Sequence, residues 1–358
     1  QLTPLSGLAD QLRQGLVQTV AMVRLLVQGW YEPIGSRGLH ASTLVQQTLS
    51  LLVQHGGLNA KQLWEMLCSR GAFREIEQAL FISLLKGLGQ KEIIFQDPTG
   101  LILLAPKGEQ LTEHYSFYAA FNSQEEFRIV SDGRTLGSMP INRPLAPGGF
   151  VIFGGRRWQV IRVSQDELVI EVKPGAGGAL PSFEGSPGAT IHDHVREEMR
   201  TVLEGDQPVT FLDKLGQQLL AEARSNYRQM DLARTAVRES GNYVQILLWK
   251  GDRIHDTLTL LLQFKGIEAL SHGLFVEVRG LGAGEVLDAL RAIASNHEIN
   301  PQDVAAEVET KLRQKWDALL PEDVLDADFA ADALDVSGTI ASIQGLEGEL
   351  RSGQFCSL

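Results

Sequence analysis

Residues 92–105 read Glu92-Ile93-Ile94-Phe95-Gln96-Asp97-Pro98-Thr99-Gly100-Leu101-Ile102-Leu103-Leu104-Ala105. Two short apolar runs flank Asp97-Pro98-Thr99-Gly100, and turn-forming residues between such runs predict a β-hairpin. Three helices are predicted before the hairpin, over residues 42–54, 59–69 and 75–88, with Asn59 as an N-cap. Three helices followed by a hairpin are typical of a winged helix. We therefore predict a winged-helix domain over residues 36–120.

The regions on either side of this domain have different periodicities. Residues 5–29 carry apolar residues at three- and four-residue steps, which predicts one long helix within a connecting segment, residues 1–35. Residues 121–190 contain short strand-like runs separated by glycine-rich turns, which predicts a small antiparallel β-barrel-like domain. Residues 191–337 mix helical and strand patterns and predict an α+β C-terminal domain, whereas residues 338–358 are expected to be a flexible tail. The expected fold class is a multidomain α+β protein.

Within the C-terminal domain we expect specific elements. The predicted helices cover residues 191–204, 212–229, 253–264, 285–294, 301–319 and 321–333, and the predicted strands cover residues 244–249 and 274–278. Gly280-Leu281-Gly282-Ala283-Gly284 follows the second strand and imitates a dinucleotide-binding loop. The spacing of its glycines is wrong for that motif, so we interpret it as a plain strand-to-helix turn.

The net charge of −12 over 358 residues is unevenly distributed. Residues 301–358 hold 12 acidic and four basic residues, a net of −8, which leaves −4 for the first 300 residues. Phosphate binding needs only a local basic track, so the overall sign does not exclude a nucleic-acid partner.

Several classes of protein are excluded by what the sequence lacks. It has no apolar run of about 18 residues and no secretory signal, so we expect no membrane contact and a cytoplasmic location. It also lacks a phosphate-binding Gly-x4-Gly-Lys-Ser/Thr motif, and Cys68 and Cys356 lack metal-ligand spacing. We therefore expect no metal, cofactor or catalytic residue in this chain, and we interpret its start at Gln1 as the start of a fragment.

Two segments of the β-rich region have the chemistry of a nucleic-acid site. Gly154-Gly155-Arg156-Arg157-Trp158 combines two cations with an indole, and we expect Arg156 and Arg157 to contact phosphates and Trp158 to be core. The alternative is that the arginines pair with Glu167 or Glu171 across the sheet. Phe183, in a glycine- and proline-rich loop, is a candidate for stacking on a base.

A third segment begins at His192-Asp193-His194. His192, Arg196 and Arg200 share one helical face, which predicts either a phosphate-binding surface or a solvated one. A capped helix start is favoured over a metal site for His192-Asp193-His194. The third helix of the winged-helix domain has few basic residues, Arg74, Lys86 and Lys91, which favours a structural strut over a helix that reads duplex DNA.

Several short motifs together resemble the region behind the motor domains of large helicase-related (Lhr-like) DEAD/DEAH-box helicases. They are Val17-Gln18-Thr19-Val20-Ala21-Met22, Gly29-Trp30-Tyr31-Glu32-Pro33, Leu44-Val45-Gln46-Gln47, Lys107-Gly108-Glu109, His114-Tyr115-Ser116-Phe117-Tyr118-Ala119, Phe153-Gly154-Gly155-Arg156-Arg157-Trp158, Pro181-Ser182-Phe183-Glu184-Gly185, Ile191-His192-Asp193 and Trp249-Lys250-Gly251-Asp252-Arg253 with Thr257-Leu258. The resemblance covers roughly residues 5–295.

The resemblance implies the accessory region of a superfamily 2 helicase that uses ATP and Mg²⁺ to move 3′ to 5′ along single-stranded DNA or RNA. It also implies that two RecA-like motor domains, which bind the ATP, precede this segment in the same polypeptide. In that family an aromatic residue of the β domain stacks on a base. Many members carry Trp where this chain carries Phe183.

On this resemblance we expect the protein to act in DNA repair. We expect the enzyme to be the parent protein that carries the motor domains, and this chain itself to be non-catalytic. The expected nucleic-acid-binding residues are Arg156, Arg157, Lys173, Phe183, His192, Arg196, Arg200, Lys250 and Arg253. Two other functions stay open: a winged-helix transcription regulator that binds duplex DNA, and a protein-interaction module.

Overall fold

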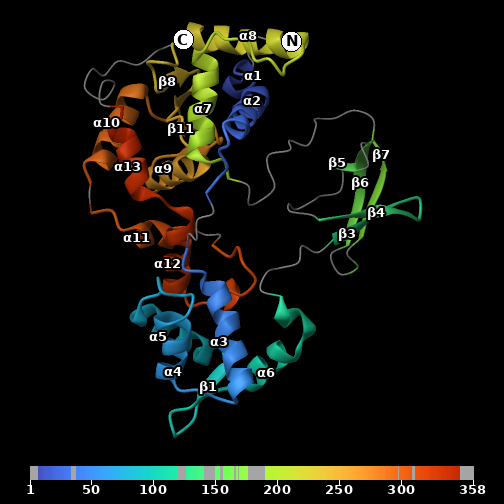
Figure 1. Ribbon diagram of the computed structural model, residues 1–358, viewed down its shortest axis with the longest axis vertical. Coiled ribbons are helices and arrows are strands. Elements are labelled where there is room, and N and C mark those ends of the chain that lie inside the picture. Colours follow the sequence, from blue (N-terminus) through green and yellow to red (C-terminus); the bar gives the residue numbers. More distant parts are fainter. Residues whose placement is uncertain are drawn as a thin grey trace. The chain divides into compact units, whose positions relative to one another are not determined.

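The computed structural model describes residues 7–33, 38–119, 126–140, 150–153, 156–164, 167, 169–175, 190–296, 298–308 and 311–346. The chain divides into two compact units. Tyr115–Ala189 form the smaller, β-rich unit, and Gln1–His114 together with Thr190–Leu358 form the larger unit. In the described residues the larger unit is built from helices with a two-stranded and a four-stranded sheet, and the smaller unit from a five-stranded sheet. The chain is therefore a mixed α+β protein (Figure 1). None of the described helices combines the length and the apolar character required to cross a bilayer.

The predicted winged-helix segment contains three helical segments and a hairpin. Their bounds are α3 Ala41–His55, α4 Ala60–Trp64 with a π-helical turn Glu65–Ser69, α5 Gln78–Gln90, β1 Ile94–Gln96 and β2 Ile102–Leu104. Asn59 caps α4 as expected, because its Oδ1 accepts a 2.9 Å hydrogen bond from the Gln62 amide. Asp97 holds the turn, since its Oδ1 accepts the amides of Thr99 and Leu101, each at 2.9 Å. Helix α6, Pro106–Glu113, follows the hairpin.

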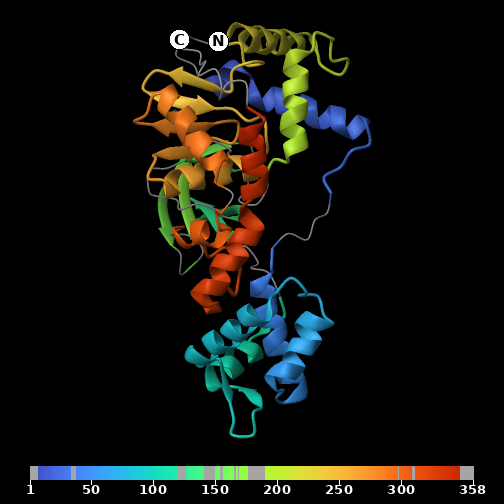
Figure 2. The same cartoon turned by 90° about the vertical axis from the view of Figure 1, so that its left-hand side faces the viewer.

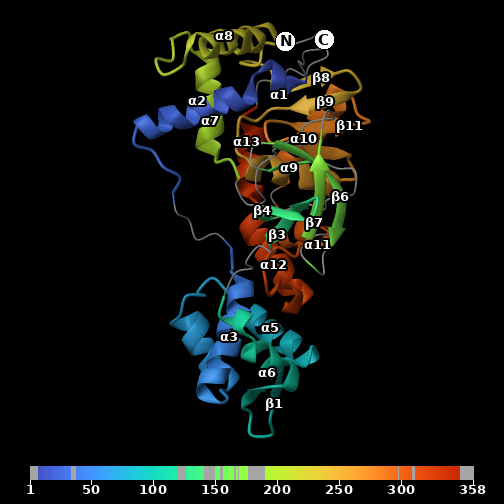
Figure 3. The same cartoon turned by 90° about the vertical axis from the view of Figure 1, so that its right-hand side faces the viewer.

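The expected long N-terminal helix is two helices, α1 Leu8–Gln11 and α2 Gln14–Val27. The prediction of one helix was wrong because Arg13 adopts a left-handed conformation, with φ of 50°, which ends α1. Helix α2 crosses α7, Asp193–Glu204, and both pack with α8, Lys214–Gln229 (Figures 2 and 3). Val17 and Val20 lie in the shared core, so the N-terminal segment is an integral part of the larger unit.

A four-stranded antiparallel sheet forms the centre of the C-terminal half. The strands are β8 Val237–Ser240, β9 Tyr243–Ile246, β10 Ala269–Ser271 and β11 Val276–Arg279, in the order β10-β11-β9-β8. Its buried face packs against α9, Asp252–Phe264, and α10, Ala283–Ala294. Strand β11 pairs antiparallel with both neighbours. The glycine-rich stretch after it is therefore a plain strand-to-helix turn, as predicted.

The last part of the larger unit is less helical than expected before residue 320 and more helical than expected after residue 335. Helix α11 covers only Pro301–Ala306 of the helix predicted over 301–319, and a short 3₁₀ turn covers Asp317–Leu319. Helix α12 is Glu322–Ala333, and α13 is Val336–Gln344. The prediction of a flexible tail from residue 338 was wrong for α13, because Ile343 is fully buried in the core beside α9 and α10. The last twelve residues, 347–358, lie outside the described part.

Helix α12 and the residues that precede it form hydrogen bonds with the predicted winged-helix segment. The Ala41 amide at the start of α3 donates a 3.2 Å hydrogen bond to Asp328 Oδ1, and the Trp316 amide donates a 2.9 Å hydrogen bond to Ser42 Oγ. His40 precedes α3 but makes no side-chain cap. Asp328 therefore satisfies an amide that the helix cannot satisfy itself.

The smaller unit contains a five-stranded sheet. The strands are β3 Glu126–Ser131, β4 Arg134–Pro140, β5 Phe150–Phe153, β6 Arg156–Ser164 and β7 Val169–Pro174, in the order β4-β3-β7-β6-β5. The expectation of an antiparallel barrel-like domain is corrected in two respects. The described strands form an open sheet with β4 and β5 at its edges, and β3 pairs parallel to β7. Ile129, Val160 and Ile170 form its core, against which Trp158 packs, as predicted for this tryptophan.

Candidate nucleic-acid interface

Two motifs that lie far apart in the sequence interlock where α7 and α9 begin. Ile191 donates its amide to Asp252 Oδ2 at 2.8 Å, and the Asp252 amide returns a 3.0 Å hydrogen bond to the Ile191 carbonyl. The Gly251 amide donates to Asp193 Oδ1 at 2.7 Å. These four residues form the α7–α9 junction. Because each loop satisfies the backbone of the other, neither helix start is independent.

Glycine is required at position 251. A Cβ atom there would lie 2.3 Å from the Ile191 carbonyl oxygen and 2.8 Å from both the amide nitrogen and Oδ1 of Asp193. Two of these three atoms belong to the backbone of a hydrogen-bonded pair of loops, so a side-chain rotation alone cannot relieve the overlap.

Arg196 stabilises the α7–α9 junction through a buried ion pair. Its side chain is 2% exposed, and Nη2 lies 2.9 Å from Asp252 Oδ1, while Nη1 lies 3.4 Å from Gln18 Oε1 of α2. The expectation that Arg196 shares a surface with His192 and Arg200 is therefore corrected. Its guanidinium already pairs with a carboxylate in the interior, and such a pair is costly to break.

A buried histidine lies beneath the same junction. His255 of α9 is fully buried, and its Nε2 accepts a 3.4 Å hydrogen bond from the Leu248 amide. Burial, with a further contribution from the Arg196 charge, lowers the pKa of His255 to about 4. The imidazole is consequently neutral at physiological pH, which is the state required to accept this hydrogen bond.

His192 caps α7 rather than presenting a free ring. Its Nδ1 accepts a 3.1 Å hydrogen bond from the His194 amide, which confirms the predicted capped helix start. The Trp30 ring lies against both imidazoles, with its centroid 5.4 Å from that of His192 and 5.0 Å from that of His194. Three of the segments that carry the helicase resemblance therefore meet at the α7–α9 junction.

The other predicted cations of the larger unit also have partners within it. Arg200 pairs with Glu204 at 2.8 Å and donates to the Ala233 carbonyl at 2.8 Å. Lys250 Nζ lies 2.5 Å from Glu197 Oε1.

Arg253 reaches the end of α12. Its Nη2 donates to the Ala331 carbonyl at 3.0 Å and to the Leu334 carbonyl. A cation at these terminal carbonyls is favoured by their unsatisfied acceptors and by the helix dipole. Arg253 thus connects α9 to α12.

Exposed cations remain on one face of the five-stranded sheet. Lys173 lies opposite Gln159 in the antiparallel pair of β6 and β7, and Arg162 lies opposite Glu171 in the same pair. Arg128 pairs with Val169 in the parallel register of β3 and β7. Paired residues point to the same side of a sheet, so Arg128, Arg162 and Lys173 share a face, and all three are exposed.

The alternative prediction for Arg156 and Arg157 was an ion pair with Glu167 or Glu171, and in the structure Arg162 pairs with both of these carboxylates. Its Nη2 lies 3.3 Å from Glu171 Oε1 and 3.4 Å from Glu167 Oε2. Sequence reasoning missed both Arg128 and Arg162. The signal available for them was strand alternation, which places them on the Lys173 side once the pairing of strands is known.

Arg156 and Arg157 open strand β6, where their backbones pair with Phe153 and Ile152. Their side chains, and the whole of Phe183, lie outside the described residues. These three assignments stay predictions. No family model, curated protein or solved structure matches this chain. Its function is therefore argued from the residues and their geometry.

Proposed function

We propose that this chain is the accessory nucleic-acid-binding region of an Lhr-like, superfamily 2 ATP-dependent helicase that moves 3′ to 5′ and acts in DNA repair. Single-stranded DNA or RNA is its proposed ligand. ATP and Mg²⁺ belong to RecA-like motor domains of the same polypeptide. The observation that carries the proposal is the convergence of Trp30, Ile191–Asp193 and Lys250–Asp252 at the α7–α9 junction. Three of the motifs that resemble this family therefore meet in one place, although they lie far apart in the sequence.

The smaller unit supplies the proposed strand-binding surface. Lys173 and Arg128 are exposed on one face of its sheet, and the predicted contacts Arg156, Arg157 and Phe183 belong to the same unit. Exposed cations beside an aromatic residue bind a single strand by phosphate contact and stacking. Arg196, Arg200, Lys250 and Arg253 have partners inside the larger unit, so we assign them to its architecture.

The proposed winged helix acts as a strut. The order of its helices and hairpin, together with the backbone pairing of Leu58 with Ile102, supports that fold. Lys91 at the end of α5 donates to the carbonyls of Ala318 at 2.6 Å and Leu320 at 3.2 Å. Pro321 packs closely against Gly87 of the same helix. Helix α5 is therefore anchored to the segment that leads into α12.

The remaining surface of α5 favours a protein partner over duplex DNA. A hollow of about 320 Å³ between α5 and the hairpin is lined mainly by apolar side chains, including Ile82 and Phe95, which are 43% and 47% exposed. Lys86 is the one charged residue among those that line this hollow. Duplex recognition relies on several phosphate contacts, so this observation favours protein interaction as the second candidate function.

Binding of a fluorescein-labelled oligothymidylate, followed by anisotropy over a range of salt concentrations, tests the proposal. We expect Arg128→Ala/Lys173→Ala to weaken binding and to reduce the salt slope by about one for each lost phosphate contact. Lys265→Ala removes an exposed cation from the larger unit and is the matched control. Equal slopes for all proteins would reject the sheet as the interface. Preference for a duplex over the single strand would support the transcription regulator instead.

A further inference from the structure

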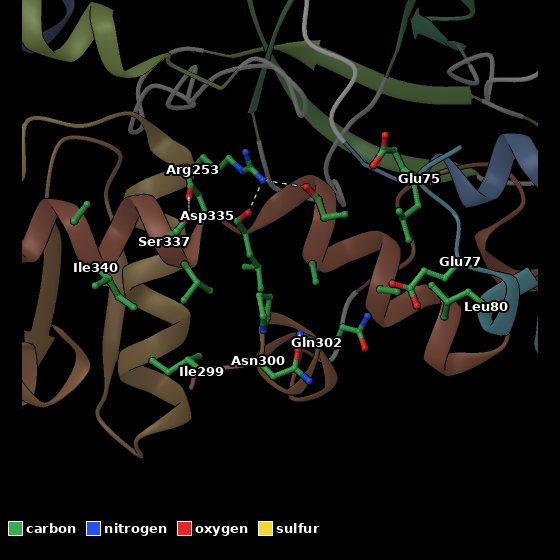
Figure 4. A pocket seen from close by; sticks show the side chains of 18 of the residues that line it. Glu75, Glu77, Leu80, Arg253, Ile299, Asn300, Gln302, Asp335, Ser337 and Ile340 are labelled. Atoms are coloured by element: carbon green, nitrogen blue, oxygen red, sulfur yellow. Dashed lines mark hydrogen bonds between the residues drawn. The ribbon is translucent and has the colours of Figure 1, made fainter. Parts of the chain in front are cut away.

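A groove of about 930 Å³ lies within the larger unit. One wall is formed by residues 75–80, which lead into α5, and the opposite wall by the start of α13 (Figure 4). Residues of α11 and α12 complete the lining. Its size is within the range of cavities that accept whole ligands or several side chains.

Small and apolar side chains line the centre of the groove. Ala327, Ala330 and Ala331 of α12 contribute only methyl groups to the lining, and Leu80 and Ile340 lie on opposite walls of the groove. Small residues let the backbone or an apolar side chain of another chain come close to α12. Ala327 and Ala330 are already buried, so the apolar surface that such a chain would remove from water belongs mainly to the half-buried Leu80, Ile299 and Ile340.

The border of the groove is acidic. Glu75 and Glu77 are exposed on one wall, and neither carboxylate has a hydrogen-bond or ion-pair partner in the part of the chain that the structure describes. Asp335 lies on the other wall, where it caps α13 by accepting the Gly338 amide at 2.7 Å. Three carboxylates therefore border an apolar groove.

Arg253 is the one basic residue among those that line the groove, and it contacts the terminal carbonyls of α12. Three carboxylates against one guanidinium leave the groove with a net negative charge. A phosphate backbone is repelled by this charge, whereas lysine and arginine side chains are attracted.

We propose that this groove binds an apolar segment of a partner protein that carries lysine or arginine residues. Its apolar side chains lie over the alanines of α12, and its cations pair with Glu75 and Glu77. Gln302, whose side chain also lines the groove, offers an amide to the backbone of that segment (Figure 4). The site shares no residue with the sheet proposed for nucleic acid.

The probe is a fluorescein-labelled helical peptide with leucine and alanine on one face and lysine on the other. Its counterpart carries glutamate at every lysine position. We expect the lysine peptide alone to bind the full chain. Glu75→Gln/Glu77→Gln should weaken binding about five- to tenfold, because two partly screened ion pairs are lost. Ala79→Trp, an exposed lining position, should weaken it at least as much by filling the groove.

Glu109→Gln/Glu113→Gln is the matched control, since it removes two exposed charges of the same sign from α6. Unchanged affinity in this control would support a local site, and an equal loss in both double variants would overturn it. Binding that survives Ala79→Trp in a protein with unaltered thermal unfolding would also overturn the proposal. Competition by oligothymidylate for the peptide would reassign the groove to nucleic acid. None of these outcomes affects the test of the sheet, because that test uses other residues and another ligand.

Discussion

The Gly251 amide donates a 2.7 Å hydrogen bond to Asp193 Oδ1, although 58 positions separate the two residues in the sequence. This bond belongs to a pair of loops that exchange backbone hydrogen bonds at the starts of α7 and α9. Residues that look like binding residues in the sequence therefore hold two helices together. Substitutions at this junction should therefore change the stability of the larger unit, and any effect on ligand binding should follow from that change.

Gly251→Ala should destabilise the larger unit by about 2 kcal/mol or more, because its methyl group would overlap the backbone of Ile191 and Asp193. Urea unfolding measures the loss. Gly284→Ala is the matched control, since a Cβ atom at this position of α10 meets no atom within 4 Å. Alanine is the better helix former, so the control should gain about 0.5–1 kcal/mol. Equal stabilities for the two variants would contradict the close packing at Gly251.

Arg196→Met should lower the free energy of unfolding by about 3–5 kcal/mol, because it leaves Asp252 without its buried partner. Asp252→Asn in the same chain should restore part of this loss. The salt dependence of oligothymidylate binding should not change in the folded protein. A stable variant with a reduced salt slope would return Arg196 to the group of phosphate contacts.

Stability should fall as the pH falls, because His255 is held neutral in the folded protein. Its folded pKa of about 4 lies below the ordinary value of 6.5, so its contribution is fully present above pH 6.5 and is lost as the pH falls toward 4. By pH 5 the loss is about 2 kcal/mol.

His255→Gln removes the titration and keeps an acceptor for the Leu248 amide. Urea unfolding at pH 7 and pH 5 should show a smaller loss in this variant than in the parent protein. Equal losses would show that His255 is not responsible.

Phe183→Ala should weaken binding of oligothymidylate by about 1–3 kcal/mol, the usual contribution of one stacked base, with little change in melting temperature. Phe211→Ala is the matched control, since Phe211 is a half-exposed aromatic residue of the larger unit. Anisotropy titrations compare the two. Unchanged affinity in Phe183→Ala, or an equal loss in both variants, would reject stacking on Phe183.

Local sequence signals predicted the local structure well. Asn59 before a helix and Asp97 in a turn act through residues two to four positions away, so their roles could be read directly. Arg196 could not be understood in this way. Its helix shows both polar and apolar residues, and its partner Asp252 comes from a distant loop. A periodic pattern identifies a helical face but does not say which face another element covers.

The pairing of strands was the second feature that could not be predicted from the sequence. Short strand-like runs separated by glycine-rich turns predicted strands in residues 121–190. The parallel pairing of β3 with β7 was missed, because it depends on contacts between residues far apart in the sequence. Arg128 was consequently not predicted to share a face of the sheet with the β7 cation Lys173. Strands β8 and β10 have four and three residues, too few to show a period.

The insertion of the smaller unit between His114 and Thr190 affects the order in which the chain can fold during synthesis. Chains emerge from the ribosome with the N-terminus first, and compact units fold as wholes. The β-rich unit has all its residues once position 189 has emerged. Helix α2 must still wait for α7, and α3 must wait for Asp328. The middle of this chain can therefore reach its native contacts while its beginning remains unpartnered, and the apolar face of α2 stays exposed until α7 has emerged.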